Sequence, residues 1–410
     1  MPKKTKINFE EVFSSCNIVW MYLIMFTLAT FHKLLFTENA FNNYDIFRYS
    51  FNHLMNGQSL YVAYPEQYFD LFKYSPSFAL LMGPFWILPR WIGVLIWNLI
   101  NALLPVLALK YFTLSTKERW FFALFILIEM LTSVQNAQSN GLMLGLMMLA
   151  FGMIEKHKSR SAALAITLGF SIKIFAIGVA FMQFFQPRKK QIVAWGLLFG
   201  TLISIGPALF VGFDGLWQHY AEWMKLLAHD TAHELNYSIM AFFERSLDIR
   251  MNNVIWLGLG LILLFLPLIR SSHYAIGSWR IAYFAMILVW IVLFNHKTES
   301  PTFIIAMAGA ALWFLQSPRT VLRISMLAIV FVFTGLSSTD LFPSAIRENI
   351  IKPFAIKVLP CILLFVFMLW ELLFSKAFEA ETNDQKRNTV AEQSKMAHTI
   401  TTQHTDEGNR

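Results

Sequence analysis

Apolar runs recur along most of the chain and are long enough to form helices that cross a lipid bilayer. A spanning helix needs about 20 mostly apolar residues, and local thinning of the bilayer accommodates shorter ones. Such runs lie at 17–36, 92–110, 120–134, 140–154, 161–172, 174–186, 191–212, 252–269, 281–294, 302–316, 324–336 and 354–374. We therefore expect an all-α fold, a polytopic transmembrane helical bundle with about 12 crossings.

The composition agrees with a membrane protein and excludes other classes. Of the 410 residues, 56% are hydrophobic and only 14% are charged, whereas soluble domains have about 25% charged residues. The net charge of +8 comes from short basic connections between apolar runs, which is typical of membrane proteins, so we expect no nucleic-acid partner. The two cysteines, Cys16 and Cys361, exclude a disulfide framework and a cysteine-based zinc site.

Lysine and arginine concentrate in alternate connections between the runs. Seven segments that fall on one side of the predicted bundle hold 21 of the 33 Lys and Arg residues. They are 1–16, 110–119, 155–160, 187–190, 270–280, 317–323 and 375–410. Because positively charged loops face the cytoplasm, we expect a multi-pass protein of the inner (plasma) membrane with both termini cytoplasmic.

This topology makes two further predictions. The short apolar run Ser77–Leu88 is bounded by Pro76 and Pro89, and we expect a re-entrant or interfacial helix that does not cross. The stretch 161–186 is expected to cross twice, with a hairpin turn at Lys173.

The chain divides into two parts by composition. Residues 1–374 contain all the apolar runs and are expected to form one transmembrane domain. Residues 375–410 mix Asn, Gln, Thr, Lys and Glu with few apolar residues. Such a segment cannot bury enough apolar surface to fold alone, so we expect a disordered cytoplasmic tail.

The first long outer loop has the pattern of an amphipathic helix. Asn43 is a plausible N-cap and Gly57 a plausible stop. Asp45, Arg48 and Asn52 share one polar stripe, so we expect a helix on the membrane surface with its acid at the outer boundary. Asp45 is either a functional carboxylate or a charge that stabilises the helix N-terminus.

Lys173 interrupts an apolar stretch at the same predicted boundary. A lysine in the membrane costs about 2.5–3.5 kcal/mol and is usually functional or paired. It can hold an anionic lipid headgroup such as a phosphate, or it can simply extend its ammonium to the interface from a helix end.

Other polar groups fall on this outer side too. The turn that contains Gln138 and Asn140 offers amides that can bind sugar hydroxyls, or that can satisfy the backbone of a tight turn. Glu129, in the preceding helix, is either a functional intramembrane acid or an acid bonded to a neighbouring helix.

A short outer loop carries His296, Lys297 and Glu299. The histidine could shuttle a proton near neutral pH, and the lysine could bind phosphate. The alternative is an ordinary solvated turn.

Short motifs in a fixed order resemble glycosyltransferase family 87 over about residues 41–310, most of the chain. They are Asp45 with Asn56-Gly57-Gln58-Ser59-Leu60-Tyr61, then Phe72-Lys73-Tyr74-Ser75-Pro76, Gln138-Ser139-Asn140-Gly141-Leu142, and Ser171-Ile172-Lys173-Ile174-Phe175. The family patterns are an acid, G-x-x-x-Y, F-x-Y-P-P, G-Q-x-N and K-x-x-P. The chain has Ser75, Ala137 and Ala176 where the family usually has proline, glycine and proline.

The resemblance implies a GT-C fold and an inverting glycosyltransferase whose active site lies on the extracytoplasmic (periplasmic) side. Its donor would be a polyprenyl-phosphate sugar, with mannose or arabinofuranose favoured, and its acceptor a glycolipid or glycan in contact with membrane lipid. By this resemblance Asp45 is the general base and Lys173 holds the donor phosphate. The remaining substrate-binding candidates are Arg48, Gln138, Asn140, His296, Lys297 and Glu299. The chain has no Asp-x-Asp pair, so we expect no metal, and we expect no cofactor.

Two other function classes fit a polytopic chain, namely a lipid-linked oligosaccharide flippase or other transporter, and a non-catalytic assembly factor of the envelope. A transporter typically has charged residues at mid-membrane in broken helices related by internal repeats. Here the charges gather at one predicted boundary beside a large outer loop, which favours the enzyme.

Overall fold

The computed structural model of the chain describes residues 15–185, 189–229, 237–316, 318–337, 339–375 and 378. The N-terminal lysines and almost all of the predicted tail 375–410 lie outside the described residues. Within these ranges the regular structure is helical throughout and no strand occurs, which confirms the predicted all-α class.

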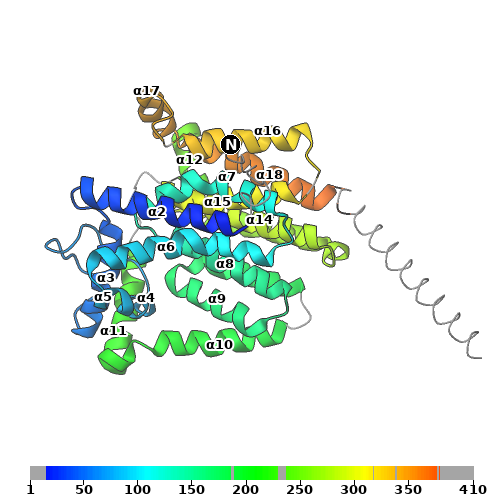
Figure 1. Ribbon diagram of the computed structural model, residues 1–410. Coiled ribbons are helices and arrows are strands. Elements are labelled where there is room, and N and C mark those ends of the chain that lie inside the picture. The colour runs from blue at the N-terminus through cyan, green and yellow to red at the C-terminus, as the bar shows by residue number, and fades with distance from the viewer. Residues whose placement is uncertain are drawn as a thin grey trace, which may run out of the picture.

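The helices follow one another through mostly short connections (Figure 1). In chain order they are α2 (Ser15–Phe36), α3 (Asn42–Met55), α4 (Pro76–Leu81), α5 (Gly83–Ile87), α6 (Arg90–Ala108), η1 (Leu109–Tyr111), α7 (Thr116–Gln135), α8 (Asn140–Glu155), α9 (Ser159–Ile172), η2 (Ile174–Phe185), α10 (Lys189–Ile205), α11 (Ala208–His229), α12 (Ile239–Leu247), α13 (Asn253–Phe265), η3 (Leu266–Ile269), η4 (Ser271–His273), α14 (Gly277–Leu293), η5 (Ser300–Thr302), α15 (Phe303–Leu315), α16 (Val321–Val330), η6 (Phe331–Leu336), α17 (Ser344–Ile346), η7 (Arg347–Ile351), η8 (Ile356–Val358) and α18 (Leu359–Phe374).

Several helices have the length and composition of membrane spans. Among the described residues, Cys16–Phe36, Arg90–Tyr111 and Ile356–Phe374 are each long and apolar enough to cross a bilayer. Helices α10 and α11 pass the same test as a pair but are bent by 91° at their junction. Shorter apolar helices, including α8, α9, α14 and α15, lie alongside the long ones (Figure 1). The chain is a helical membrane protein.

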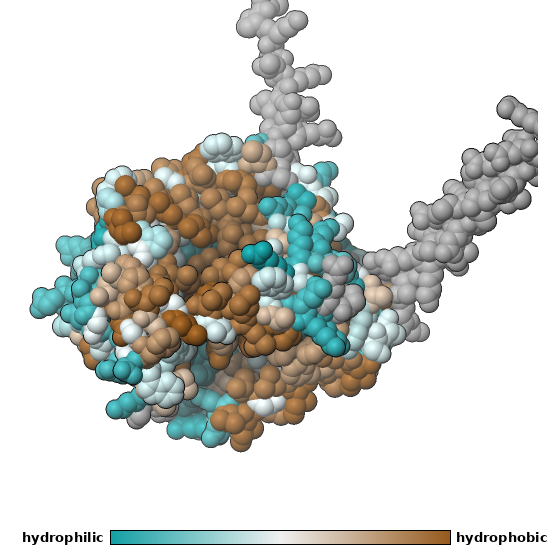
Figure 2. All heavy atoms as spheres, turned by 90° about the horizontal axis from the view of Figure 1, so that it is seen from below, coloured by the Kyte–Doolittle hydropathy of each residue, from teal (hydrophilic) through white to brown (hydrophobic). Residues whose placement is uncertain are grey.

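Apolar side chains cover the outside of this bundle as well as its core. On α10, Leu197 and Leu202 are 69% and 61% exposed. Exposing such apolar side chains is unfavourable in water but not in lipid. Figure 2, which views the molecule from below, shows apolar side chains gathered over much of this face. The exposed apolar face therefore fits contact with lipid chains.

Glycine allows α8 to pack closely against α6. A Cβ atom at Gly141 would lie 2.5 Å from the carbonyl oxygen of Asn101, and one at Gly145 would lie 2.6 Å from Cγ of Leu104. Small residues four positions apart let the backbones of membrane helices approach each other. This close packing fixes the start of α8, and with it Asn140, against α6.

The stretch predicted to cross twice is broken at Lys173. That residue has an extended backbone (φ −142°, ψ 132°) between α9 and η2, and α9 packs against η2. Helix η2 is a 3₁₀ helix of 12 residues. A 3₁₀ helix rises about 2.0 Å per residue, so η2 extends about 24 Å, further than an α-helix of the same length.

The predicted re-entrant or interfacial helix at Ser77–Leu88 is two short helices, α4 and α5, which meet at Met82. Pro76 occupies the first turn of α4, where a backbone N–H would have no partner within the helix. The Ser75 side chain caps the helix by accepting a hydrogen bond from the amide of Phe78. Both short helices pack on α3, so this segment supports the first loop.

A buried ion pair ties α7 to the start of α18. The Nζ atom of Lys357 lies 2.7 Å from a carboxylate oxygen of Glu129, and both side chains are inaccessible to solvent. Lys357 also donates to the Ser300 hydroxyl at 2.8 Å. Of the two interpretations of Glu129, the structure shows the acid bonded to a neighbouring element.

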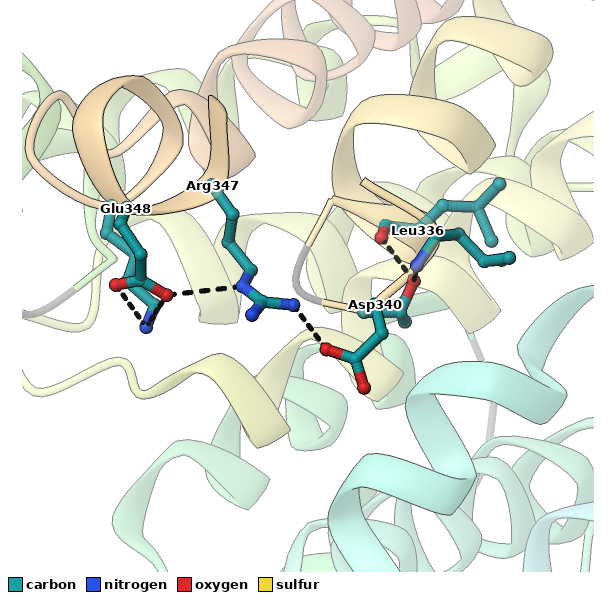
Figure 3. A network of polar contacts seen from close by, with 7 residues as sticks. Leu336, Asp340, Arg347 and Glu348 are labelled. Carbon is teal, nitrogen blue, oxygen red and sulfur yellow. Dashed lines mark hydrogen bonds and ion pairs between the residues drawn. The ribbon is translucent and has the colours of Figure 1, made fainter. Parts of the chain in front are cut away.

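The connection between η6 and α18 carries a chain of exposed ion pairs (Figure 3). Arg347 bridges Asp340 at 2.6 Å and Glu348 at 3.2 Å, and Lys352 binds Glu348 at 2.8 Å. Ion pairs at such exposed sites contribute little to stability. They order this connection without fixing the bundle.

We predict that Lys357→Met destabilises the protein by about 3–5 kcal/mol, because it leaves the Glu129 carboxylate buried without its partner. Thermal unfolding in detergent micelles measures the effect. The double variant Glu129→Leu with Lys357→Met should recover most of the loss, and the control Lys352→Met should change little. Equal unfolding temperatures for both single lysine variants would contradict the prediction.

Candidate functional site

Helix α3 sits at one end of the long helices, where it contacts α4, α5 and α11 (Figure 1). It begins at Asn42, after Phe41 in the left-handed conformation (φ 69°), and it ends at Met55. Asn43 is therefore not the N-cap that the sequence suggested. Its side-chain amide instead donates to the Asn136 carbonyl at 2.9 Å, which ties α3 to the turn between α7 and α8.

The carboxylate of Asp45 is held by an arginine from the start of α6. Arg90 donates from Nε to Oδ1 at 2.8 Å and from Nη2 to Oδ2 at 2.6 Å. The Asp45 side chain is 13% exposed and the Arg90 side chain 39%. The only sequence signal for this partner is that Arg90 is predicted to lie on the side where basic residues are scarce.

Arg48 does not contact Asp45, although both belong to the predicted polar stripe. Its guanidinium donates to the carbonyls of Phe85 and Trp86 at 3.4 and 3.3 Å, and to that of Leu88 at 3.2 Å. It also lies over the Trp86 ring, 4.8 Å from the centroid. Arg48 therefore satisfies the end of α5, and α3 packs one face into the protein.

Asp45 and Arg90 line a polar pocket of about 380 Å³. Its other walls include the carboxylate of Glu66 and the amide of Gln67. Phe69, which is 62% exposed, also lines it. Hydrogen-bonding groups around a cavity with one exposed ring can accommodate a sugar, whose surface is polar at its hydroxyls and apolar on its ring faces.

A second cluster surrounds Lys173. Its ammonium donates to the Asn140 amide oxygen at 2.8 Å and lies 6.0 Å from the centroid of the Tyr74 ring. Among the described residues, no carboxylate oxygen lies within 4.0 Å of this nitrogen. Lys173 is largely buried, and burial lowers its pKa to about 8. The hydrogen-bond partner of the lysine is thus neutral, so the positive charge of the ammonium can still pair with an anion.

Gln138 and Glu299 complete this cluster from two other connections. The side-chain amide of Gln138 donates to a carboxylate oxygen of Glu299 at 2.9 Å. The charge of Glu299 also acts on Lys173 and on the partly buried Tyr74. The structure therefore brings together four of the predicted site residues, from three separate connections: Gln138, Asn140, Lys173 and Glu299.

The other two predicted residues of the late loop lie beside this cluster. His296 is exposed and Lys297 is partly buried. The backbone amide of Lys297 donates to the side chain of Asn295 at 3.2 Å. Thr298, between them and Glu299, is fully buried, and its hydroxyl donates to the carbonyl of Val292 at the end of α14, which anchors the loop to that helix.

The Asp45 pocket and the Lys173 cluster lie at the same end of the bundle. A hydrogen bond of 2.9 Å from the Asn43 side chain to the Asn136 carbonyl ties α3 to the turn that precedes Asn140. Lys173 is not among the residues that line the Asp45 pocket. The Phe47 ring of α3 meets the Tyr74 ring edge-on, with centroids 5.0 Å apart, and the Lys173 ammonium lies 6.0 Å from the centroid of that Tyr74 ring.

Metal-binding groups do not gather at either site. Within the parts of the chain that the structure describes, no three His, Cys, Asp or Glu side chains are placed to hold an ion. The polar groups here are instead one arginine, one lysine, carboxylates and amides, a set suited to hydroxyls and a phosphate.

The model of glycosyltransferase family 87 matches residues 72–339 of the chain. The match covers the Lys173 cluster and Arg90, and it begins after Asp45. No curated protein matches the chain.

We predict that Gly141→Ala destabilises the protein by about 1–3 kcal/mol, because the added methyl group would overlap the Asn101 backbone. It should also move Asn140 away from Lys173. Thermal unfolding in detergent checks the stability. Gly258→Ala is the matched control, since nothing lies within 4 Å of a Cβ there. A control as unstable as the test variant would contradict this account.

Proposed function

The chain belongs to glycosyltransferase family 87, and from that premise we propose that it transfers a sugar from a polyprenyl-phosphate donor to a lipid-linked or glycan acceptor. Its family and its apolar helices make it a membrane glycosyltransferase. The sugar that we propose is mannose or a pentose such as arabinofuranose, and the transfer inverts the anomeric centre.

The observation that carries the proposal is that Lys173 has no carboxylate within ion-pair distance in the part of the chain that the structure describes. A buried cation is costly unless an anion or several hydrogen bonds compensate it. Its partner here is the neutral amide of Asn140. A phosphate from the lipid donor would supply the missing charge, and the ammonium would in turn stabilise the charge that develops on the leaving lipid phosphate.

Asp45 is the proposed general base. In the transfer, an acceptor hydroxyl oxygen attacks the anomeric carbon, the bond from that carbon to the phosphate oxygen breaks, and the hydroxyl proton passes to the Asp45 carboxylate. The products are the glycosylated acceptor and free polyprenyl phosphate. One displacement of this kind inverts the anomeric centre and needs a single carboxylate.

The remaining predicted residues take supporting roles. Gln138 and Asn140 position the donor sugar or its headgroup with amides on either side of a tight turn. Glu299 orients Gln138, and His296 and Lys297 contact the substrate from the same loop. Arg48 supports the site indirectly, because its guanidinium holds the end of α5.

We also propose the topology that this chemistry requires. About 12 crossings with both termini in the cytoplasm put the Asp45 pocket and the Lys173 cluster on the extracytoplasmic face of the plasma membrane. Both sites lie at the end of the bundle opposite the basic connections 110–119 and 155–160, which supports this topology (Figure 1).

Asp45→Asn should lower transfer by about 10²- to 10⁴-fold, because it removes the base but keeps the shape of the side chain. The purified protein would be incubated with mannosyl, glucosyl and arabinofuranosyl polyprenyl phosphates and a membrane lipid extract, and released polyprenyl phosphate would be quantified. Asp70→Asn is the matched control, as an exposed acid of the same loop paired with Lys73 at 3.3 Å. If the wild-type protein consumes no donor, the proposed function is wrong.

Donor binding should weaken as the pH rises through about 8, because the lysine that pairs with the phosphate loses its proton there. Binding of undecaprenyl phosphate across pH 6–10, a range of about four units around that pKa, measures it. Lys173→Arg stays charged over this range, so its affinity should not fall in the same way. A wild-type affinity that is flat across the range would speak against Lys173 as the phosphate partner.

A further inference from the structure

We propose that Arg90 is a positioning residue that fixes the Asp45 carboxylate at the edge of its pocket and keeps it ready to accept a proton. The inference rests on the proposed function, because it gives Asp45 its role as base. It concerns a residue outside all the motifs that the sequence analysis used.

The first argument is the geometry of the pair. Two parallel hydrogen bonds, 2.8 and 2.6 Å long, run from the planar guanidinium to the two carboxylate oxygens of Asp45. This bidentate arrangement fixes the plane of the carboxylate as well as its position. An ionised carboxylate has about four sites that can accept a hydrogen bond. Arg90 occupies two of them, so about two remain for the hydroxyl of the substrate that receives the sugar.

The second argument is how firmly Arg90 itself is held. It is the first residue of α6, directly after Pro89 in an extended conformation. Its Nη2 atom also donates to the carbonyl of Ala40, next to the left-handed Phe41 that begins α3. The guanidinium therefore locks the first turn of α3 to the first turn of α6, and Asp45 cannot rotate away without breaking several bonds.

The third argument is the place of the arginine. A basic residue is disfavoured on the proposed extracytoplasmic side of a span. An arginine there, aimed at one carboxylate that is only 13% exposed, is better explained by what it does to that carboxylate.

Other charged or titratable groups near Asp45 are few. Arg48 and Tyr44 lie on the same helix as Asp45, and the charges of Asp45 and Arg90 both act on the Tyr44 hydroxyl. Glu66 lines the same pocket, and Lys33 lies 5.6 Å from the Phe41 ring. Within the described chain none of these groups hydrogen-bonds to the carboxylate, whereas Arg90 binds both of its oxygens.

The transfer assay tests the proposal through the separate effects on kcat and on KM. Arg90→Gln should lower kcat by about 10- to 100-fold through misplacement of the base. The KM for the donor should change by less than about threefold, because the proposed donor site at Lys173 is left intact. Arg90→Lys keeps the charge but loses the fork, so it should restore only part of kcat.

A chemical readout separates this inference from the proposed function. Water-soluble carbodiimide modifies accessible carboxyl groups, and mass spectrometry of the Asp45 peptide gives the extent of labelling at one fixed pH. Labelling should rise by about twofold or more in Arg90→Gln, where the bidentate pair no longer holds the carboxylate, even if no donor in the panel is consumed. Unchanged labelling, or a KM that rises as much as kcat falls, would overturn the proposal and leave Arg90 as a structural residue.

Discussion

The hydrocarbon core of a bilayer offers no hydrogen-bond partner, so each polar group inside this bundle must find its partner within the protein. Glu129 and Lys357 do so at 2.7 Å. Beside the basic connections, where the helices end, Arg323 likewise pairs with Glu371 at 3.0 Å, and the Trp313 indole binds the same carboxylate. Arg280 and Glu155 do so at 2.6 Å between α14 and α8. Each pair joins helices that are distant in sequence, and thus the requirement to satisfy charges also determines which helices are neighbours.

The candidate sites depend on the same requirement. Helix α8 can approach α6 only because glycines face it, and that approach brings Asn140 under Lys173. The Glu129–Lys357 pair reaches Ser300, the residue after Glu299, and so anchors the loop that meets Gln138. Contacts between the helices therefore hold the polar turns in place. Lys173 differs from the paired charges because its partner is an amide, which makes it the natural place for an anion from outside.

Much of this arrangement could be predicted from the sequence, because apolar runs and basic connections obey simple physical rules. They gave the all-α class, the break at Lys173 and the gathering of Gln138, Asn140, Lys173 and Glu299. Side-chain partners could not be predicted, because they depend on helix rotation and depth. The pairing of Asp45 with Arg90 joins residues 45 positions apart, and no local pattern encodes it. For the same reason the partners of Arg48, which are carbonyls at the end of α5, could not be predicted from its polar stripe.

The winding of η2 has a consequence for how this segment tolerates change. In a 3₁₀ helix, side chains three positions apart lie directly above one another. Ala176, Val179 and Met182 accordingly form one buried column, while Ile174 and Ile177 stand on an exposed one. In this segment the positions that must fit the buried column therefore recur at every third residue. A single inserted residue would rotate all that follows by about a third of a circle and turn the buried column outward into lipid.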